Sequence, residues 1–246
     1  MKNSTILLFF IIFQINAFGQ NHRELNLVNA IIEYKNVIKF EDSLKFNQNL
    51  SQLNFAIEDV LENENLLNFK KFQKITDSLN INYTIKKSEN NNLLLFTMSD
   101  NMFHWNYIVD DNAVVLKNHK WHEYFTEIHN LSQNEFLLIV QRDDLVFSCN
   151  YAYVFQKSGT SFQKKKAFEN RTQLTLCNFT EIQNSPPENP EHFSLPARKI
   201  SFDYKNKVIS YGSCINSMTG KTTIGKAKYI NGNFKIKDCD ERKDSE

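Results

Sequence analysis

The sequence has little glycine and proline, few cysteines and no large excess of charge. Its 246 residues include 6 Gly, 4 Pro and 4 Cys. Glycine and proline this scarce exclude a collagen-like or low-complexity chain. The 29 basic residues balance 28 acidic ones, which argues against nucleic-acid binding, because that function concentrates positive charge. The aromatic residues, by contrast, are many: 21 Phe, 9 Tyr and 2 Trp predict a packed core and exclude a disordered chain.

The sequence also lacks an apolar run of the roughly 20 residues that a membrane span needs. Its longest run is Ile6–Phe13, preceded by Lys2. Ala17-Phe18-Gly19 follows, with small residues at the two positions that a signal peptidase recognises. Residues 1–19 are therefore predicted to be a cleavable signal peptide, which leaves Gln20 as the new N-terminus. We expect the mature protein to be soluble, without a membrane span, and either periplasmic or secreted.

Four cysteines follow the leader, and an even number in an exported chain predicts two disulfides. Three pairings are possible. The favoured one joins Cys149 to Cys177 and Cys214 to Cys239, because each bond would link neighbouring hairpins. No Cys-x-x-Cys or Cys-x-His spacing supports a metal site, so neither a metal nor another cofactor is predicted.

Residues 20–84 have helical periodicity. Helices are expected over about 23–40, 42–62 and 65–79, each with one apolar face. The second has the clearest apolar stripe, formed by Phe46, Leu50, Leu53, Ile57 and Val60.

Residues 85–246 change to a period of two, which indicates roughly ten antiparallel strands joined by short turns. The most regular strand is Leu145–Phe155, in which Cys149, Tyr151 and Tyr153 share the face expected to be the core face. Asn231-Gly232 is the strongest hairpin signal, because both turn residues need positive φ.

The predicted fold class is therefore α+β. An N-terminal helical segment of two to three helices precedes a large antiparallel β-meander. The strand spacing leaves open a sandwich, an open barrel or a partial propeller-like sheet.

The passage from Phe72 to Asp111 carries a resemblance to a known group. Ser99-Asp100 leads into an aromatic strand with Phe103, Trp105 and Tyr107, after helices and a leader. In this it resembles uncharacterised exported proteins of Bacteroidetes, although Asn101 stands where a glycine often follows the aspartate. The resemblance implies an exported, β-rich protein and no particular chemistry.

Histidines and paired acids are the weak candidates for catalysis. Four histidines lie between 104 and 129, and His119 and His122 are the closest pair. On a helical turn these two could act together, but on a strand, residues three apart point to opposite faces. A connecting segment is expected here. Asp143 and Asp144 could complete a hydrolytic site, although adjacent acids between strands are more often turn residues.

The last hairpin places lysines on one face, as a weak candidate for binding an anion. They are Lys226, Lys228, Lys235 and Lys237. The alternative is that these lysines protect an edge hairpin from aggregation, countered by the acids from Asp238 onward. The many aromatic residues could also form a carbohydrate platform, but their alternation favours core packing.

The function that these features favour is a non-enzymatic binding or interaction module of the cell envelope, with a protein or glycan as its partner. The alternatives are a periplasmic hydrolase with a His/Asp site and an inhibitor or immunity-type partner protein.

Overall fold

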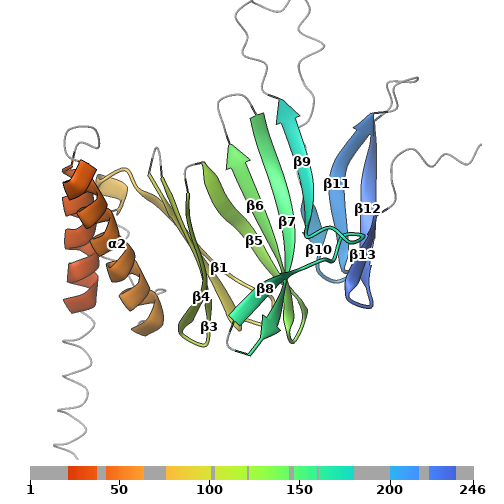
Figure 1. Cartoon of the computed structure of the whole chain (residues 1–246), viewed down its shortest axis with the longest axis horizontal. Coiled ribbons are helices and arrows are strands. Elements are labelled where there is room, and N and C mark those ends of the chain that lie inside the picture. The colour runs from red at the N-terminus through yellow and green to blue at the C-terminus, as the bar shows by residue number, and fades with distance from the viewer. Residues whose placement is uncertain are drawn as a thin grey trace, which may run out of the picture.

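The computed structural model describes residues 22–37, 43–63, 76–100, 103–120, 122–143, 147–159, 161–179, 200–215 and 222–236. Within these ranges, helical segments at the N-terminal end are followed by thirteen strands in three antiparallel sheets. The predicted α+β class is confirmed. Figure 1 shows the helices at one end and the sheets beyond them, in chain order. The predicted leader lies outside the described residues, and no helix within them is long and apolar enough to cross a membrane.

Two helices each bury one apolar face. The first spans residues 22–35, and the second, α2, is Ser43–Asn63. The apolar stripe predicted for α2 is confirmed, because Leu53, Ile57 and Val60 are buried and Phe46 and Leu50 pack against the same cluster. Of the third expected helix, the described residues contain only a helical turn at 76–78.

Sheet A begins at residue 82, slightly before the expected change of period. Its four strands follow one another in space in chain order: β1 (Asn82–Lys87), β2 (Leu93–Ser99), β3 (His104–Asp110) and β4 (Ala113–Lys120). On β3, the side chains alternate between the two faces. Trp105 and Tyr107 pack with the helices, whereas Ile108 packs with sheet B.

Sheet B is the middle layer. It contains β5 (Glu123–Ser132), β6 (Glu135–Asp143), β7 (Phe147–Ser158), β8 (Ser161–Lys165) and β9 (Gln173–Phe179). The strand β7 is central, since it pairs with β6 on one side and with β8 and β9 on the other.

The expectation of a single core face on β7 was incomplete. Phe155 packs toward sheet A with Tyr151 and Tyr153 partly buried beside it, as expected. Ala152 and Val154, on the opposite face, are fully buried against sheet C. Both faces are covered because the sheet lies between two others, so its strands are apolar on both sides.

The expectation of a connecting segment around His122 was wrong over most of its length. Residues 113–120 belong to β4 and residues 123–132 to β5, and His122 lies in a turn directly before β5. His122 adopts a positive φ of 60° in that turn.

Sheet C is the third sheet. It contains β10 (Ser201–Asp203), β11 (Val208–Ile215), β12 (Thr222–Ile230) and β13 (Asn233–Ile236). The predicted hairpin is confirmed in register, because Tyr229 pairs with Phe234 and Ile230 with Asn233. Asn231 and Gly232 have φ values of 50° and 83°, as the two-residue turn requires.

Three apolar clusters hold the layers in the order helices, sheet A, sheet B, sheet C (Figure 1). Hydrogen bonds between the sheets add to these apolar contacts. The Lys157 ammonium on β7 donates to Asp110 on β3 at 2.6 Å, and Lys207 donates to the Leu131 carbonyl at 2.6 Å. Within the described residues, the predicted β-meander is divided into three antiparallel sheets that stack in layers.

Gly225 should be intolerant of any side chain. A Cβ built at this position on β12 would lie 2.1 Å from Cε2 of Tyr211, whose ring lies over the glycine. Tyr211 is buried between sheets C and B and has little room to move. We expect Gly225→Ala to lower the free energy of unfolding by about 1–3 kcal/mol through overpacking, as measured by chemical denaturation.

The control for this prediction is Tyr211→Ala combined with Gly225→Ala. In the double variant the new methyl group has no ring to meet, so the alanine should add almost nothing to the cost of Tyr211→Ala. An unchanged cost in both backgrounds would contradict the steric explanation.

Candidate functional site

The structure does not bring His119 together with the other catalytic candidates. His119 lies on β4 opposite Trp105, on the face of sheet A that packs with the helices. Its ring is 5.0 Å from that of Tyr107, and burial lowers its pKa. Its Nε2 and the Tyr107 hydroxyl are both buried without a hydrogen-bond partner in the described residues.

His122 and Asp143 lie together at the start of β5 and the end of β6. The Asp143 amide donates to the His122 carbonyl at 2.8 Å. The Asp143 carboxylate accepts from the Tyr124 hydroxyl at 3.0 Å and from Gln141. These bonds fix one end of sheet B. His119 faces the helices, whereas His122 and Asp143 lie together at one end of sheet B, so within the described residues these three do not form one centre. Asp144 lies outside the described residues.

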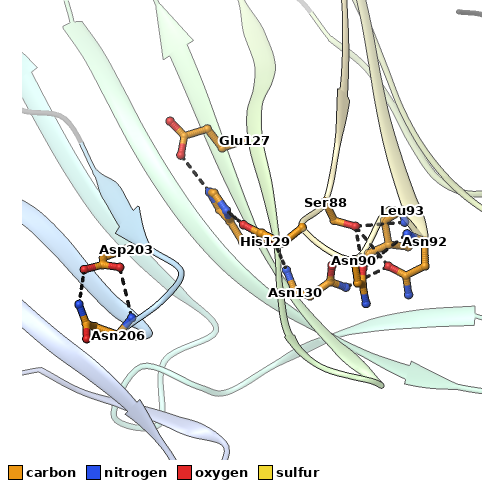
Figure 2. A network of polar contacts seen from close by, with 10 residues as sticks. Ser88, Asn90, Asn92, Leu93, Glu127, His129, Asn130, Asp203 and Asn206 are labelled. Carbon is orange, nitrogen blue, oxygen red and sulfur yellow. Dashed lines mark hydrogen bonds and ion pairs between the residues drawn. The ribbon is translucent and has the colours of Figure 1, made fainter.

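A third histidine, His129 on β5, links all three sheets. Its Nδ1 is hydrogen-bonded to Glu89 in the β1–β2 turn. Its Nε2 lies 3.0 Å from the Glu127 carboxylate, a contact drawn in Figure 2. The ring of Phe202, from β10, lies 5.0 Å away. Burial would lower the pKa of His129, but the bonds to the two carboxylates outweigh it and raise the pKa. This arrangement connects layers and has no free imidazole nitrogen.

Of the four cysteines, Cys149 is the one whose side chain the structure describes. It is buried and disulfide-bonded. Directly opposite it in the β7–β9 register is Cys177, the favoured partner. The side chains of Cys177, Cys214 and Cys239 lie outside the described part, so the predicted pairing stays a prediction.

The lysines of the last hairpin lie on the outer face of sheet C. Lys228 is directly opposite Lys235, and both are exposed, as is Lys226. In the same row, two strands away, lies Asp203. Lys237 is outside the described residues. Anion binding on this face stays a hypothesis.

A concave site occurs elsewhere, between β4 of sheet A and the facing side of sheet B. It is a pocket of about 260 Å³. A strip of side chains on sheet B forms its floor, contributed by Phe125, Leu138, Val140, Tyr153 and Phe155. Leu116, Asn118 and Lys120 of β4 line it from the sheet A side.

One buried amide positions the rim of this pocket. Asn106 on β3 is fully buried, and its side chain donates to the carbonyls of Asn118 and Glu123 at 3.1 and 3.0 Å. Its Oδ1 accepts from the Phe125 amide at 2.8 Å. Both amide hydrogens and the carbonyl oxygen of Asn106 are therefore hydrogen-bonded, and they hold the two strands that carry the rim in one relative position.

Asn118 and Glu123 form the polar rim. The Asn118 amide donates to Glu123 Oε1 at 2.7 Å, and Lys120 reaches Glu123 Oε2 at 3.4 Å. The Glu123 side chain keeps only 14% of its surface exposed. These contacts present an amide and a carboxylate to the pocket in a fixed orientation.

The floor holds a half-buried tyrosine under a lysine. The ring of Tyr153 stacks on that of Tyr151 at 6.2 Å, and the Lys164 ammonium lies 3.9 Å from the Tyr153 centroid. Burial lowers the pKa of Lys164, and burial with the nearby Glu123 raises that of Tyr153 to about 12. The pocket therefore combines an aromatic surface with an ammonium held by a cation–π contact.

A second hollow, of about 600 Å³, lies between the two helices and is widely open to solvent. Its lining mixes polar residues, among them Asn26, Glu33 and Gln52, with apolar ones such as Phe55, whose ring is exposed. Nothing there combines a rigid polar pair with a buried floor.

Sequence analysis missed the pocket residues Asn118, Glu123 and Lys164. A carbohydrate platform was weighed, and the alternation correctly assigned most aromatic residues to the core. The remaining signal was local: Asn118, Lys120 and Glu123 are polar residues close to one another in sequence, around the turn at His122.

Comparisons with known proteins give little further information. No protein-family model matches the chain, and no curated protein matches it either. Oligopeptidase B from Trypanosoma brucei, in a closed form with covalently bound antipain, aligns at 10% identity and a TM-score of 0.26. Oligopeptidase B from Leishmania major aligns at 6% identity and 0.25. Each match covers 63% of this chain and 27% of the peptidase, and TM-scores this low do not establish a shared fold.

Proposed function

We propose that this chain is an exported, non-enzymatic binding protein of the cell envelope, and that its pocket between sheets A and B holds one ring of a saccharide. The leader predicted at residues 1–19 supports the exported location. The observation that carries the proposal is the half-buried ring of Tyr153 in the floor, faced by the hydrogen-bonded pair Asn118 and Glu123.

The chemistry of the two walls favours a sugar. A pyranose has apolar C–H faces, which pack on an aromatic ring, and hydroxyl groups around its edge, which need donors and acceptors. A wholly apolar ligand would leave the remaining donors and acceptors of Asn118 and Glu123 facing carbon, whereas hydroxyl groups can bond to them. The volume of about 260 Å³ is just below the range of about 300–1,000 Å³ typical of drug-sized ligands, which favours a single ring.

Binding without catalysis is favoured by the number of acids. Among the described residues lining the pocket, Glu123 is the one carboxylate. Glycoside hydrolysis ordinarily uses a pair of carboxyl groups on either side of the scissile bond. The histidines considered as catalytic candidates do not line this pocket either.

The test is a glycan-binding screen of the full mature protein, followed by calorimetric titration of the saccharides retained. We expect Tyr153→Ala to weaken binding about tenfold or more, because it removes the stacking surface. The matched control is Tyr204→Ala, since Tyr204 is an exposed tyrosine on the β10–β11 turn of sheet C. Circular dichroism establishes that both variants are folded.

Two results would overturn the proposal. One is the absence of any saccharide that binds the wild type. The other is a folded Tyr153→Ala variant that binds as tightly as the Tyr204→Ala control.

A further inference from the structure

In the part of the chain that the structure describes, one pocket ammonium has no carboxylate within ion-pair distance, although Glu123 acts on it from further away. Among the described residues, Lys117 is paired with Glu58 at 2.9 Å and Lys120 with Glu123 at 3.4 Å. Lys164 is the third lysine of the lining, and its contact is with the Tyr153 ring. The pocket thus has an excess of one positive charge, on a side chain that extends over the aromatic floor.

The position of Lys164 couples charge to stacking. Its Nζ lies 3.9 Å from the centroid of the ring that a sugar would cover. A sugar therefore has to displace the ammonium from the ring face. A neutral sugar gives nothing in exchange for the lost cation–π contact, whereas a carboxylate at the ring edge offers a charge-assisted hydrogen bond instead.

We propose that the saccharide is acidic: the ligand is a uronic acid residue whose ring packs on Tyr153 and whose carboxylate binds the Lys164 ammonium. This inference rests on the proposed function and names its substrate class. The position of Lys164 supports it, because the residue is exposed and its ammonium lies over the ring, where a ligand carboxylate can reach it. The Glu123 carboxylate is held by Asn118 and Lys120, which leaves the ligand's acid group to Lys164.

The experiment compares methyl β-D-glucuronide with methyl β-D-glucoside, two probes that differ only at C6, on the full mature protein. Titration calorimetry or ligand-observed NMR gives the two dissociation constants. We expect the wild type to bind the glucuronide about tenfold more tightly than the glucoside. We expect Lys164→Gln to abolish this preference by weakening the glucuronide and by leaving the glucoside unchanged or tighter, since the ring face is then unblocked.

The matched control is Lys166→Gln, which removes an exposed lysine two residues further along the chain, outside the pocket lining. It should keep the preference. Equal binding of both sugars by the wild type, or a preference that survives Lys164→Gln, would refute the acidic ligand and leave the saccharide proposal standing. If neither sugar binds and the glycan screen is also empty, the proposed function fails with it.

Discussion

Replacing Trp105 with alanine should lower the free energy of unfolding by about 3–5 kcal/mol. The indole is fully buried on the face of sheet A that packs with the helices. Its ring meets that of Tyr34 edge-on at 5.2 Å and that of Phe103 at 4.9 Å. Its Nε1 donates to Asn54 Oδ1 on α2 at 3.0 Å. One side chain therefore joins both helices to the sheet, and alanine leaves a cavity at their junction.

The loss of stability in Trp105→Ala should be concentrated in the helices. Amide hydrogen exchange should show the helices at 22–35 and α2 losing protection before sheets B and C, because their apolar faces are buried on sheet A. Chemical denaturation gives the global value. The control is Phe55→Ala on α2, whose ring is 75% exposed, and which should change stability by no more than about 0.5 kcal/mol. A Trp105→Ala variant as stable as this control would contradict the assigned role.

Local signals made much of the fold predictable. The stripe on α2 and the Asn231-Gly232 hairpin are set by residues close in sequence, and the structure confirms both. The turn at Asp111 and Asn112 is of the same kind, since both residues adopt positive φ between β3 and β4. Such elements are fixed by periodicity and turn chemistry and do not depend on the order of the layers.

The strand β5 was missed for a physical reason. Its pairing with β6 has register shifts between Phe125 and Glu127 and between Asn130 and Ser132. Each irregularity inserts a residue and reverses the alternation. Phe125 and Ile128 consequently face sheet A although they are an odd number of residues apart. A search for strict period two cannot detect such a strand.

The pocket depends on the stacking of layers, which no local pattern contains. Its residues come from β4, β5, β6, β7 and β8. The Lys164 ammonium on β8 lies over the ring of Tyr153 on the neighbouring strand β7. The alternation placed Tyr153 correctly on an inward face. It could not tell that β4 leaves this part of the face accessible, because that depends on how sheet A lies over sheet B.

Replacing Glu135 with glutamine should lower the free energy of unfolding by about 2–3 kcal/mol near neutral pH. The carboxylate accepts from the Lys165 ammonium at 2.6 Å and from the Tyr229 hydroxyl at 2.6 Å. Glu135 and Lys165 belong to sheet B and Tyr229 to sheet C, so the cluster joins the layers. The side chains of Glu135 and Lys165 are only 11% and 24% exposed. Glutamine can still accept from Tyr229, but the Lys165 charge loses its partner.

The free energy of unfolding lost in Glu135→Gln should decrease as the pH falls. Burial alone would raise the pKa of Glu135, but the bonds from Lys165 and Tyr229 outweigh it and lower the pKa. A carboxyl group with a pKa lower in the folded than in the unfolded chain stabilises the fold above its unfolded value of about 4.3. That contribution is lost as the pH falls through the folded pKa. The difference between wild type and Glu135→Gln should therefore be largest near pH 7 and shrink below about pH 4.

Urea denaturation of both proteins at a series of pH values measures this difference. The matched control is Glu169→Gln, which neutralises an exposed acid in the turn after β8 and should cost no more than about 0.5 kcal/mol at any pH. The comparison isolates the cluster, because the three proteins differ only at residues 135 and 169. A gap between wild type and Glu135→Gln that stays constant down to pH 3 would mean that packing, and not the ion pair with Lys165, accounts for the cost of the substitution.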